Sequence, residues 1–218
     1  MEDADNLVYG EIATEDFMSL LEKYGATNGE EDSCDGTLEG RAFWDLGSGT
    51  GKAVMTAGLC SHFAHVRGVE LLPCTAGIAA VLVEDFERDV LPGARPISTP
   101  LRSIAVECGD FFAPECLARW QAGDFVFCNC VTWDDDTMGR LSIAAEGLRP
   151  GAVFVTVLCP LSSTKFELVE EMELAFSWGA VECLVHRRLT EEAAAAAAAL
   201  EACVAGMGTG GGDVDMDG

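Results

Sequence analysis

The chain has 218 residues, 49% of them hydrophobic, so it is long enough to bury one sizeable core. A net charge of −24 with only three lysines excludes a protein that grips nucleic-acid phosphates through its own surface. The acidity favours a basic partner, or a surface whose acids are simply solvated. No apolar run approaches the length of a membrane span and the first residues are acidic rather than signal-like, so we expect an intracellular protein that does not use a membrane.

The predicted domain covers residues 9–189 and is flanked by segments without a globular pattern. Residues 1–8 are expected to form a flexible acidic N-terminus, 9–25 a loop and a helix, 26–40 a flexible acidic loop, 41–189 a Rossmann-like core, and 190–218 an alanine-rich helix with a disordered Gly/Asp tail. The first helix is predicted over 14–24, because apolar residues recur there at helical spacing, at Phe17, Leu20, Leu21 and Tyr24.

From Arg41 onward, strand-like and helix-like segments alternate. Strands are predicted at 41–46, 65–70, 104–109, 124–129 and 152–158. Helices are predicted near 51–62, 74–90, 114–121 and 135–147. Residues 91–102 carry three prolines and are expected to form a surface loop. This alternation predicts a parallel sheet that is covered by helices on both faces.

The pattern changes after the fifth strand. Residues 172–178 and 180–187 are two strand-like runs joined at Gly179, and a polyalanine helix follows over 191–203. A terminal strand pair with one antiparallel member is typical of class I methyltransferases rather than of dehydrogenases. We therefore predict an α/β, Rossmann-like class I methyltransferase fold, with a seven-stranded, mostly parallel sheet, one antiparallel strand in the C-terminal pair and helices on both faces.

The ten cysteines are not spaced as a metal site. No C-x-x-C pair is present, so we expect no structural zinc and mostly buried, reduced thiols. Cys128 and Cys130 share one face of a predicted strand, but no second ligand pair accompanies them. The three histidines lie outside the predicted strand ends and are expected to be structural or at the surface: His62, His65 and His186.

A glycine-rich turn joins the first predicted strand of the core to its helix, in the sequence Asp-Leu-Gly-Ser-Gly-Thr-Gly-Lys. The acid directly before the glycines distinguishes this turn from the nicotinamide fingerprint. The glycines allow the backbone to approach a ligand that carries no pyrophosphate. The alternative is a tight turn that binds nothing. The candidate cofactor-binding residues of the turn are Asp45, Gly47, Ser48, Gly49, Gly51 and Lys52.

Two further acids close the next two strands. Glu70 is placed to accept hydrogen bonds from both hydroxyls of a ribose. Asp110 fits an acceptor for an adenine amino group, with the aromatic ring of Phe111 beside it. Acids at three successive strand ends predict S-adenosylmethionine as the cofactor.

Asn129 ends the fourth predicted strand, where this class of enzyme faces the methyl group that is transferred. Its side-chain carbonyl can orient an amine or an amide, and Phe127 and Trp133 are candidates for the walls of a narrow channel. Asn129 is the candidate catalytic residue, and it also belongs to the expected cofactor site. The alternative is a capping asparagine beside aromatic residues of the core.

These motifs resemble the disruptor-of-telomeric-silencing family, the non-SET histone H3 lysine methyltransferases. The resemblance covers residues 7–189 and includes a closing Ser-Trp-Gly at 177–179. It is carried by Val-Tyr-Gly-Glu at 8–11, the glycine turn at 45–52, Gly-Val-Glu at 68–70, Gly-Asp-Phe-Phe at 109–112 and Val-Phe-Cys-Asn at 126–129. In the family, the Tyr-Gly-Glu segment forms a loop over the cofactor. The resemblance therefore implies that Tyr9, Gly10 and Glu11 close the site, with Tyr9 and Glu11 in contact with the cofactor and Tyr9 also catalytic.

The chain departs from the family pattern in two respects. The family has Asn-Asn-Phe after the fourth strand, whereas this chain has Asn129-Cys130-Val131, and Trp133 is the candidate to replace the missing aromatic. Family enzymes that act on nucleosomes also carry basic segments for DNA, and this acidic chain has none.

The sequence therefore predicts a protein-lysine N-methyltransferase that acts on a basic protein, with histone H3 or the nucleosome as candidates, by direct in-line transfer and without a metal. Such an enzyme would be a chromatin regulator in the nucleus. An enzyme of the same fold that methylates a small molecule or a non-histone protein is the first alternative, and it would be cytoplasmic. A non-catalytic scaffold that binds the cofactor is the second.

Overall fold

The computed structural model describes residues 10–25, 41–60, 62–94 and 101–207. Four predicted features lie outside these residues: the acidic N-terminus 1–8, Tyr9, the acidic loop 26–40 and the end of the C-terminal tail.

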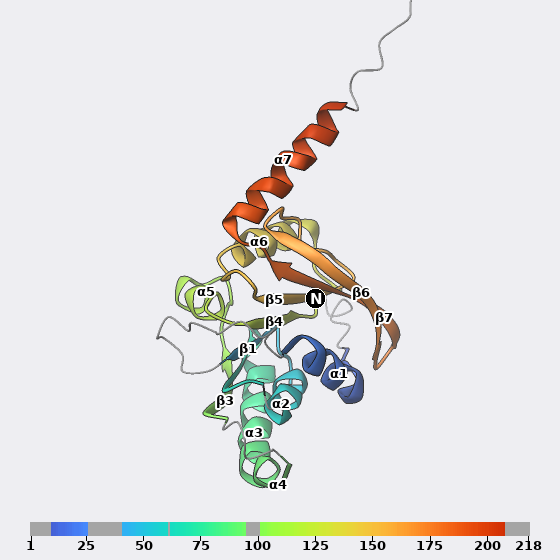
Figure 1. The fold of residues 1–218 in the computed structure, drawn as a ribbon. Coiled ribbons are helices and arrows are strands. Elements are labelled where there is room, and N and C mark those ends of the chain that lie inside the picture. The colour runs from blue at the N-terminus through green and yellow to red at the C-terminus, as the bar shows by residue number, and fades with distance from the viewer. Residues whose placement is uncertain (1–9, 26–40, 61, 95–100, 208–218) are drawn as a thin grey trace, which may run out of the picture.

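A seven-stranded sheet in the order β3-β2-β1-β4-β5-β7-β6 forms the centre of the molecule (Figure 1). The strands are β1 (Ala42–Leu46), β2 (His65–Glu70), β3 (Ser103–Cys108), β4 (Phe125–Cys128), β5 (Val153–Val157), β6 (Phe166–Phe176) and β7 (Gly179–Arg188). β1 pairs in parallel with β2 and β4, and the parallel pairing continues to β3 on one side and β5 on the other. β7 runs antiparallel to both β5 and β6. The predicted fold class is confirmed.

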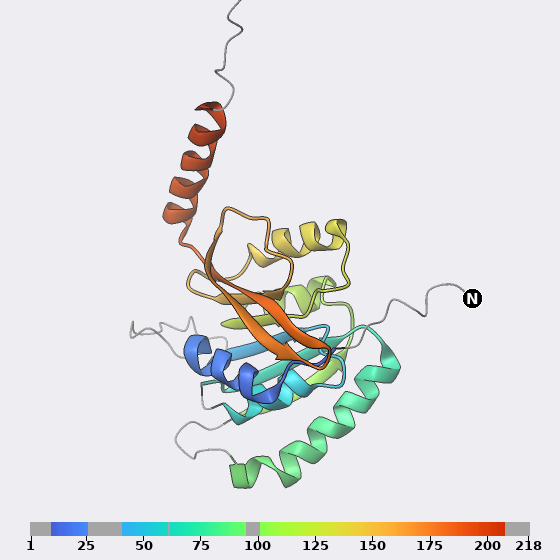
Figure 2. The same ribbon diagram turned by 90° about the vertical axis from the view of Figure 1, so that its right-hand side faces the viewer.

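Helices cover both faces of the sheet. They are α1 (Thr14–Gly25), α2 (Lys52–Leu59), α3 (Pro73–Asp89), α4 (Leu91–Ala94), α5 (Pro114–Trp120), α6 (Asp135–Ala145) and α7 (Glu191–Met207). One buried cluster joins α1, α2 and α3 to one face, and a second joins α5 and α6 to the other. α7 extends away from this body in both views (Figures 1 and 2). No helix of the described part is long and apolar enough to cross a membrane.

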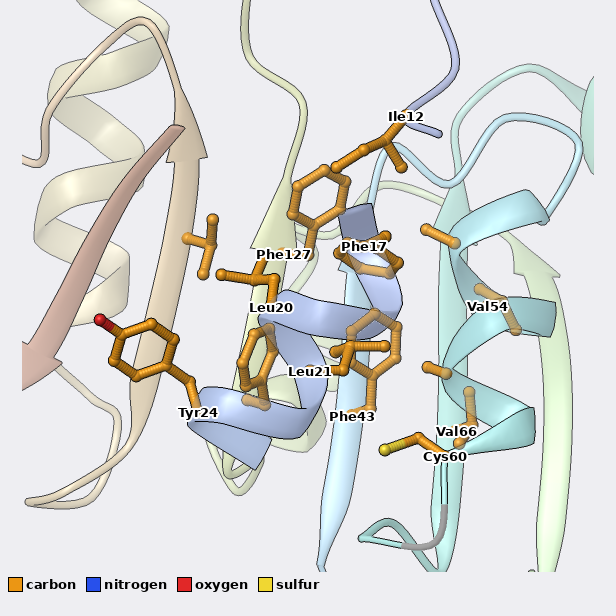
Figure 3. Close-up of a cluster of buried hydrophobic side chains, with 14 of the residues drawn as sticks. Ile12, Phe17, Leu20, Leu21, Tyr24, Phe43, Val54, Cys60, Val66 and Phe127 are labelled. Atoms are coloured by element: carbon orange, nitrogen blue, oxygen red, sulfur yellow. The ribbon is translucent and has the colours of Figure 1, made fainter. Parts of the chain in front are cut away.

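Aromatic packing holds α1 on one face of the central strands. Phe17 of α1 lies 4.9 Å from Phe127 of β4 and 6.1 Å from Phe43 of β1, measured between ring centroids. Leu20 and Leu21 are fully buried in the same cluster (Figure 3). The helical spacing of these apolar residues is therefore explained by one face of α1 that packs on the sheet.

Two predicted boundaries were wrong. β6 begins at Phe166 rather than at residue 172. The prediction missed its first half because exposed glutamates and an irregularity between Leu168 and Glu170 hide the apolar alternation of a strand. The expected loop 91–102 begins with the short helix α4. Pro92 is compatible with it, because the first turn of a helix does not need the N–H that proline lacks.

Candidate active site

A cavity of about 510 Å³ lies at the carboxyl ends of the central strands, where the strand order reverses around β1 and β4. This volume is in the usual range for sites that hold a small ligand. Three distant parts of the chain meet there: the glycine turn, the segment that follows β4, and residues 10–13, which we call the N-terminal strap. The lining residues are Gly10, Glu11, Ile12, Asp45, Gly47, Ser48, Gly49, Lys52, Ala53, Glu70, Leu71, Leu72, Thr75, Phe111, Phe127, Asn129, Thr132, Trp133 and Phe176.

The glycine turn needs its glycines for conformational reasons. Gly47, Gly49 and Gly51 have φ values of 80°, 53° and 84°, which side chains disfavour. The N–H groups of Gly47 and Ser48 both donate to the carbonyl oxygen of Val69, which ties the turn to β2. Gly47, Ser48 and Gly49 line the cavity as predicted. Gly51 is buried beneath the turn and does not line it.

Glu70 is held at the end of β2 by two backbone donors. Its Oε2 accepts from the Gly49 N–H and its Oε1 from the Leu72 N–H, each at 2.9 Å. The side chain is buried and lines the cavity. Each carboxylate oxygen can accept a second hydrogen bond, so Glu70 can receive the two vicinal hydroxyls of a ribose while the turn holds it still.

Asp45 lies deeper, at the end of β1, with 3% of its surface exposed. Burial, and then the nearby charge of Glu70, raise the pKa of Asp45 to about 8. A cationic ligand in the cavity would favour the ionised form. The lining carries one cationic side chain, Lys52, and three carboxylates, which suits a cationic ligand better than a pyrophosphate.

The N-terminal strap pairs with the tip of the β6–β7 hairpin. Ala13 N donates to the Ala175 carbonyl at 2.7 Å, and Ser177 N donates to the Glu11 carbonyl at 2.9 Å. Between these bonds, Ile12 forms an antiparallel bridge with Phe176. The strap therefore continues the sheet beyond β6, and its position depends on the hairpin.

Polar contacts also join the strap to the glycine turn. Thr50 Oγ1 donates to Glu11 Oε1 at 3.2 Å, and Lys52 Nζ lies 3.4 Å from Glu11 Oε2. Glu11 and Lys52 were both predicted to bind the cofactor. Both line the cavity, and in the structure they form an ion pair with each other.

Gly10 is required by the close approach of an aromatic ring. A Cβ atom added at Gly10 would lie 1.3 Å from Cζ3 of Trp178. Trp178 in turn stacks on Phe176, with ring centroids 5.3 Å apart and planes 16° apart. Gly10 of the Tyr-Gly-Glu segment thus packs against Trp178 of the Ser-Trp-Gly motif.

Asn129 bridges the strap and the end of β4. Its Nδ2 donates to the Gly10 carbonyl oxygen at 3.1 Å. Its Oδ1 is buried and accepts no hydrogen bond from the part of the chain that the structure describes. Because a buried acceptor without a donor costs free energy, this oxygen is suited to a donor supplied by a ligand.

The aromatic residues of the cavity fall into two groups. Trp133 stacks on Phe111, with centroids 5.4 Å apart and planes 13° apart, at the end expected to hold adenine. Phe127 lies instead among the strap and hairpin residues Ile12 and Phe176. Trp133 and Phe127 both line the cavity, and their role as walls of one channel stays a prediction. Phe176 lines the cavity and belongs to the same buried cluster as Phe127.

Asp110 does not line the cavity. Its Oδ1 accepts from the Phe112 N–H at 2.8 Å, and only its neighbour Phe111 reaches the lining.

Sequence reasoning missed several lining residues. Leu71 and Leu72 directly follow Glu70 and could have been found from that position, whereas Phe176 carries no local signal because the hairpin alone brings it to the cavity.

The cysteines and histidines occupy mostly structural positions. Eight cysteines have side chains that the structure describes, and all eight are free; Cys74 and Cys108 among them are exposed rather than buried as expected. No group of three or more His, Cys, Asp or Glu residues that could hold a metal occurs within the described ranges. His186 is buried, and its Nε2 accepts from the Leu161 N–H at 3.3 Å, so its role is to anchor the segment after β5.

The fold, together with the glycine turn that follows Asp45, defines a class I S-adenosylmethionine-dependent methyltransferase. The structure is similar to magnesium protoporphyrin IX methyltransferase from Synechocystis PCC 6803, solved with bound S-adenosylmethionine, with a TM-score of 0.52 and 15% identity over 80% of this chain and 79% of that one. It is also similar to TrmN from Thermus thermophilus, with a TM-score of 0.50 and 16% identity over 79% of this chain and 48% of that one. A methyltransferase from Methanosarcina mazei gives a TM-score of 0.50 at 13% identity, over 71% and 95% of the two chains.

The family is more specific than the fold. The sequence profile of the family described as "Histone methylation protein DOT1" matches residues 2–182. The chain therefore belongs to the DOT1 family, which confirms the resemblance found in the sequence and, with it, S-adenosylmethionine as the cofactor. No curated protein matches the sequence.

Proposed function

We propose that this chain transfers the methyl group of S-adenosylmethionine to the ε-amino group of a lysine in a basic protein, with histone H3 as the first candidate. The observation that carries the proposal is the unpartnered Oδ1 of Asn129 in the wall of the cavity, beside the strap. Membership of the DOT1 family supports histone as the substrate class. A histone substrate would place the protein in the nucleus as a chromatin regulator.

Residues of the cavity fit the cofactor. Glu70 accepts the ribose hydroxyls, and Asp45 and Glu11 provide negative charge for a ligand that is cationic overall. Phe111 and Trp133 offer aromatic faces for the adenine. When bound, S-adenosylmethionine supplies an electrophilic methyl group on a positively charged sulfur.

The acceptor side must deliver a neutral amine. A free lysine amine titrates near a pKa of about 10.4, and an apolar environment lowers this value because it disfavours the charged form. Ile12, Phe127 and Phe176 provide such an environment. Asn129 Oδ1 then accepts an N–H of the amine and directs its lone pair along the line of transfer, so positioning rather than acid–base chemistry lowers the barrier.

Incubation with radiolabelled cofactor tests the proposal. Nucleosomes, free histones and a cell extract would each be offered to the wild type, to Asn129→Ala and to Glu70→Ala, and labelled residues would be mapped by mass spectrometry. We expect methyl-lysine from the wild type and about 100-fold slower methylation by Asn129→Ala, whose cofactor binding should be retained. Glu70→Ala should lose methylation together with cofactor binding. The absence of label on lysine in every protein sample would refute protein-lysine methylation.

A small molecule or a non-histone protein is the second candidate acceptor. The segment Asn129-Cys130-Val131 lacks the second asparagine and the aromatic residue of the family, and Cys130 is fully buried instead of lining the cavity. Label recovered in the low-molecular-weight fraction of the extract would favour a small molecule. Label on a protein other than histone would keep the lysine chemistry and change the substrate.

A further inference from the structure

The outer face of α3 carries large apolar side chains that the described part of the chain leaves exposed. Ile78 is 50% exposed, Val81 59% and Leu82 41%, and Leu71 just before the helix is 65% exposed. The helix is buried only through Ala76, Ala79 and Val83, which form a separate stripe. Figure 2 shows α3 along the outer edge of the molecule.

The exposed residues form a regular stripe. Cys74, Ile78, Val81 and Leu82 recur at intervals of three and four residues, which places them on one side of the helix, away from the buried stripe. Gly77, at the margin of this stripe, has open space where a Cβ would be. A second helix can therefore approach α3 closely at this point.

Charge is distributed unevenly along α3. Residues 71–83 contain no charged side chain, in a chain of which 23% is charged. The C-terminal turn that follows holds four acids and one arginine: Glu84, Asp85, Glu87, Arg88 and Asp89. The N-terminus of α3 has no acid in its first turn and no side-chain cap. One end of the helix is therefore acidic and the other presents uncapped N–H groups, which favour negative charge.

We propose that the α3 face is the interface of a homodimer, in which α3 packs antiparallel on α3 of a second copy. The antiparallel arrangement brings the apolar stripes together and sets the acidic end of each helix beside the uncapped N-terminus of the other. A twofold axis near Ile78 places Cys74 of one copy opposite Leu82 of its partner, as an isologous interface requires. The strong negative charge of the chain and the uncharged stripe disfavour an anionic membrane surface or a nucleic acid as the occupant.

The interface would also cover one rim of the active site. Leu71, Leu72 and Thr75 line the cavity and lie at the N-terminal end of the same apolar surface. A single helix face is small for a stable interface, so the expected dissociation constant is roughly 1–100 µM.

Sedimentation equilibrium from 1 to 200 µM tests the dimer. We expect a monomer–dimer equilibrium in the wild type, and Val81→Glu should weaken it at least tenfold. Ile143→Glu is the matched control, because Ile143 is 72% exposed on α6, far from α3 in sequence and on the opposite face of the sheet. Raising the salt concentration should strengthen the dimer, since salt screens the repulsion between two acidic chains.

A cysteine variant tests the orientation. Under mild oxidation, Leu82→Cys should form a cross-linked dimer through the native Cys74, and the double variant Cys74→Ser/Leu82→Cys should not. Circular dichroism would establish that Val81→Glu is folded. A wild type that stays monomeric at 200 µM, a dimer that Val81→Glu leaves intact, or dimers cross-linked equally well in the double variant would each overturn the proposed arrangement.

Discussion

Asn129 and Gly10 are 119 residues apart in the sequence and are joined by a 3.1 Å hydrogen bond from Asn129 Nδ2 to the Gly10 carbonyl oxygen. The same side chain keeps its Oδ1 buried and without a donor in the described part of the chain. One residue thus holds the strap over the cavity with one atom and offers an acceptor to the cavity with the other. The structure of the strap and the chemistry of the acceptor site are therefore coupled at Asn129.

Asn129→Ala should separate turnover from cofactor binding. Loss of the Oδ1 acceptor should lower kcat about 100-fold, the size of effect seen when one positioned hydrogen-bonding group is removed from an active site. Loss of the bond to Gly10 should cost about 1 kcal/mol of stability. Steady-state kinetics and calorimetric titration of the cofactor would measure the two effects. Thr132→Ala, another lining residue, is the control, and an equal loss of kcat in both variants would contradict the role given to Asn129.

Gly10→Ala should displace the strap, because the added methyl group would overlap the ring of Trp178. We expect cofactor affinity to fall about tenfold and α1 to remain folded, since the overlap is local. Trp178→Ala makes room for that methyl group. The double variant should therefore bind the cofactor more tightly than the sum of the single changes predicts. Strict additivity in this double-mutant cycle would show that the two residues act separately.

Glu70→Ala removes the acceptor for two backbone N–H groups as well as the expected ribose contact. Each charge-assisted hydrogen bond of this kind contributes roughly 1.5–3 kcal/mol, so cofactor affinity should fall by at least 100-fold and the turn should loosen. Glu70→Gln keeps one acceptor oxygen, so its cofactor affinity should lie between those of the wild type and Glu70→Ala. Calorimetry measures the affinities, with Glu107→Gln on β3 as a carboxylate control outside the cavity. Unchanged binding in Glu70→Ala would contradict the proposed cofactor site.

Asp45 should make the stability of the ligand-free protein depend on pH. Its pKa is about 8 in the folded chain against an ordinary value of 3.8, so between these values the folded state holds a proton that the unfolded state has lost. Because of Asp45, the free energy of unfolding is therefore highest below pH 3.8 and falls as the pH rises to about 8. Asp45→Asn should abolish this loss and be more stable at pH 8 by several kcal/mol. Urea unfolding from pH 5 to 9 measures the difference, and parallel curves for both proteins would refute it.

The same proton should be released when a cationic ligand binds. Below pH 8, S-adenosylmethionine should displace up to one proton from Asp45, because its positive charge stabilises the carboxylate. Calorimetric titration at pH 7 in two buffers of different ionisation enthalpy would count the protons. Cofactor binding to Asp45→Asn should release fewer protons than binding to the wild type. Equal release by the wild type and the variant would assign the proton to another group.

The sequence by itself determined the order of the strands and helices and the residues at the strand ends. Local signals suffice for these features, because apolar periodicity marks the buried faces and Asp45 and Glu70 each lie at the end of a strand-like run. The sequence was least informative at β6, where glutamates and an irregular pairing conceal the strand. The role of Asp110 toward adenine stays a prediction, since its Oδ1 accepts from its own loop and the residue does not line the cavity.

Tertiary structure alone decided which distant segments complete the cavity. Phe176 and Trp178 reach the strap only because β7 inserts antiparallel beside β5 and carries the hairpin to the carboxyl edge of the sheet. The stacking of Trp133 on Phe111, and the single unpartnered oxygen of Asn129, likewise depend on contacts between segments far apart in the chain. Such contacts leave no periodic signal in the sequence, since each depends on how the strands are ordered in the sheet rather than on the residues next to it.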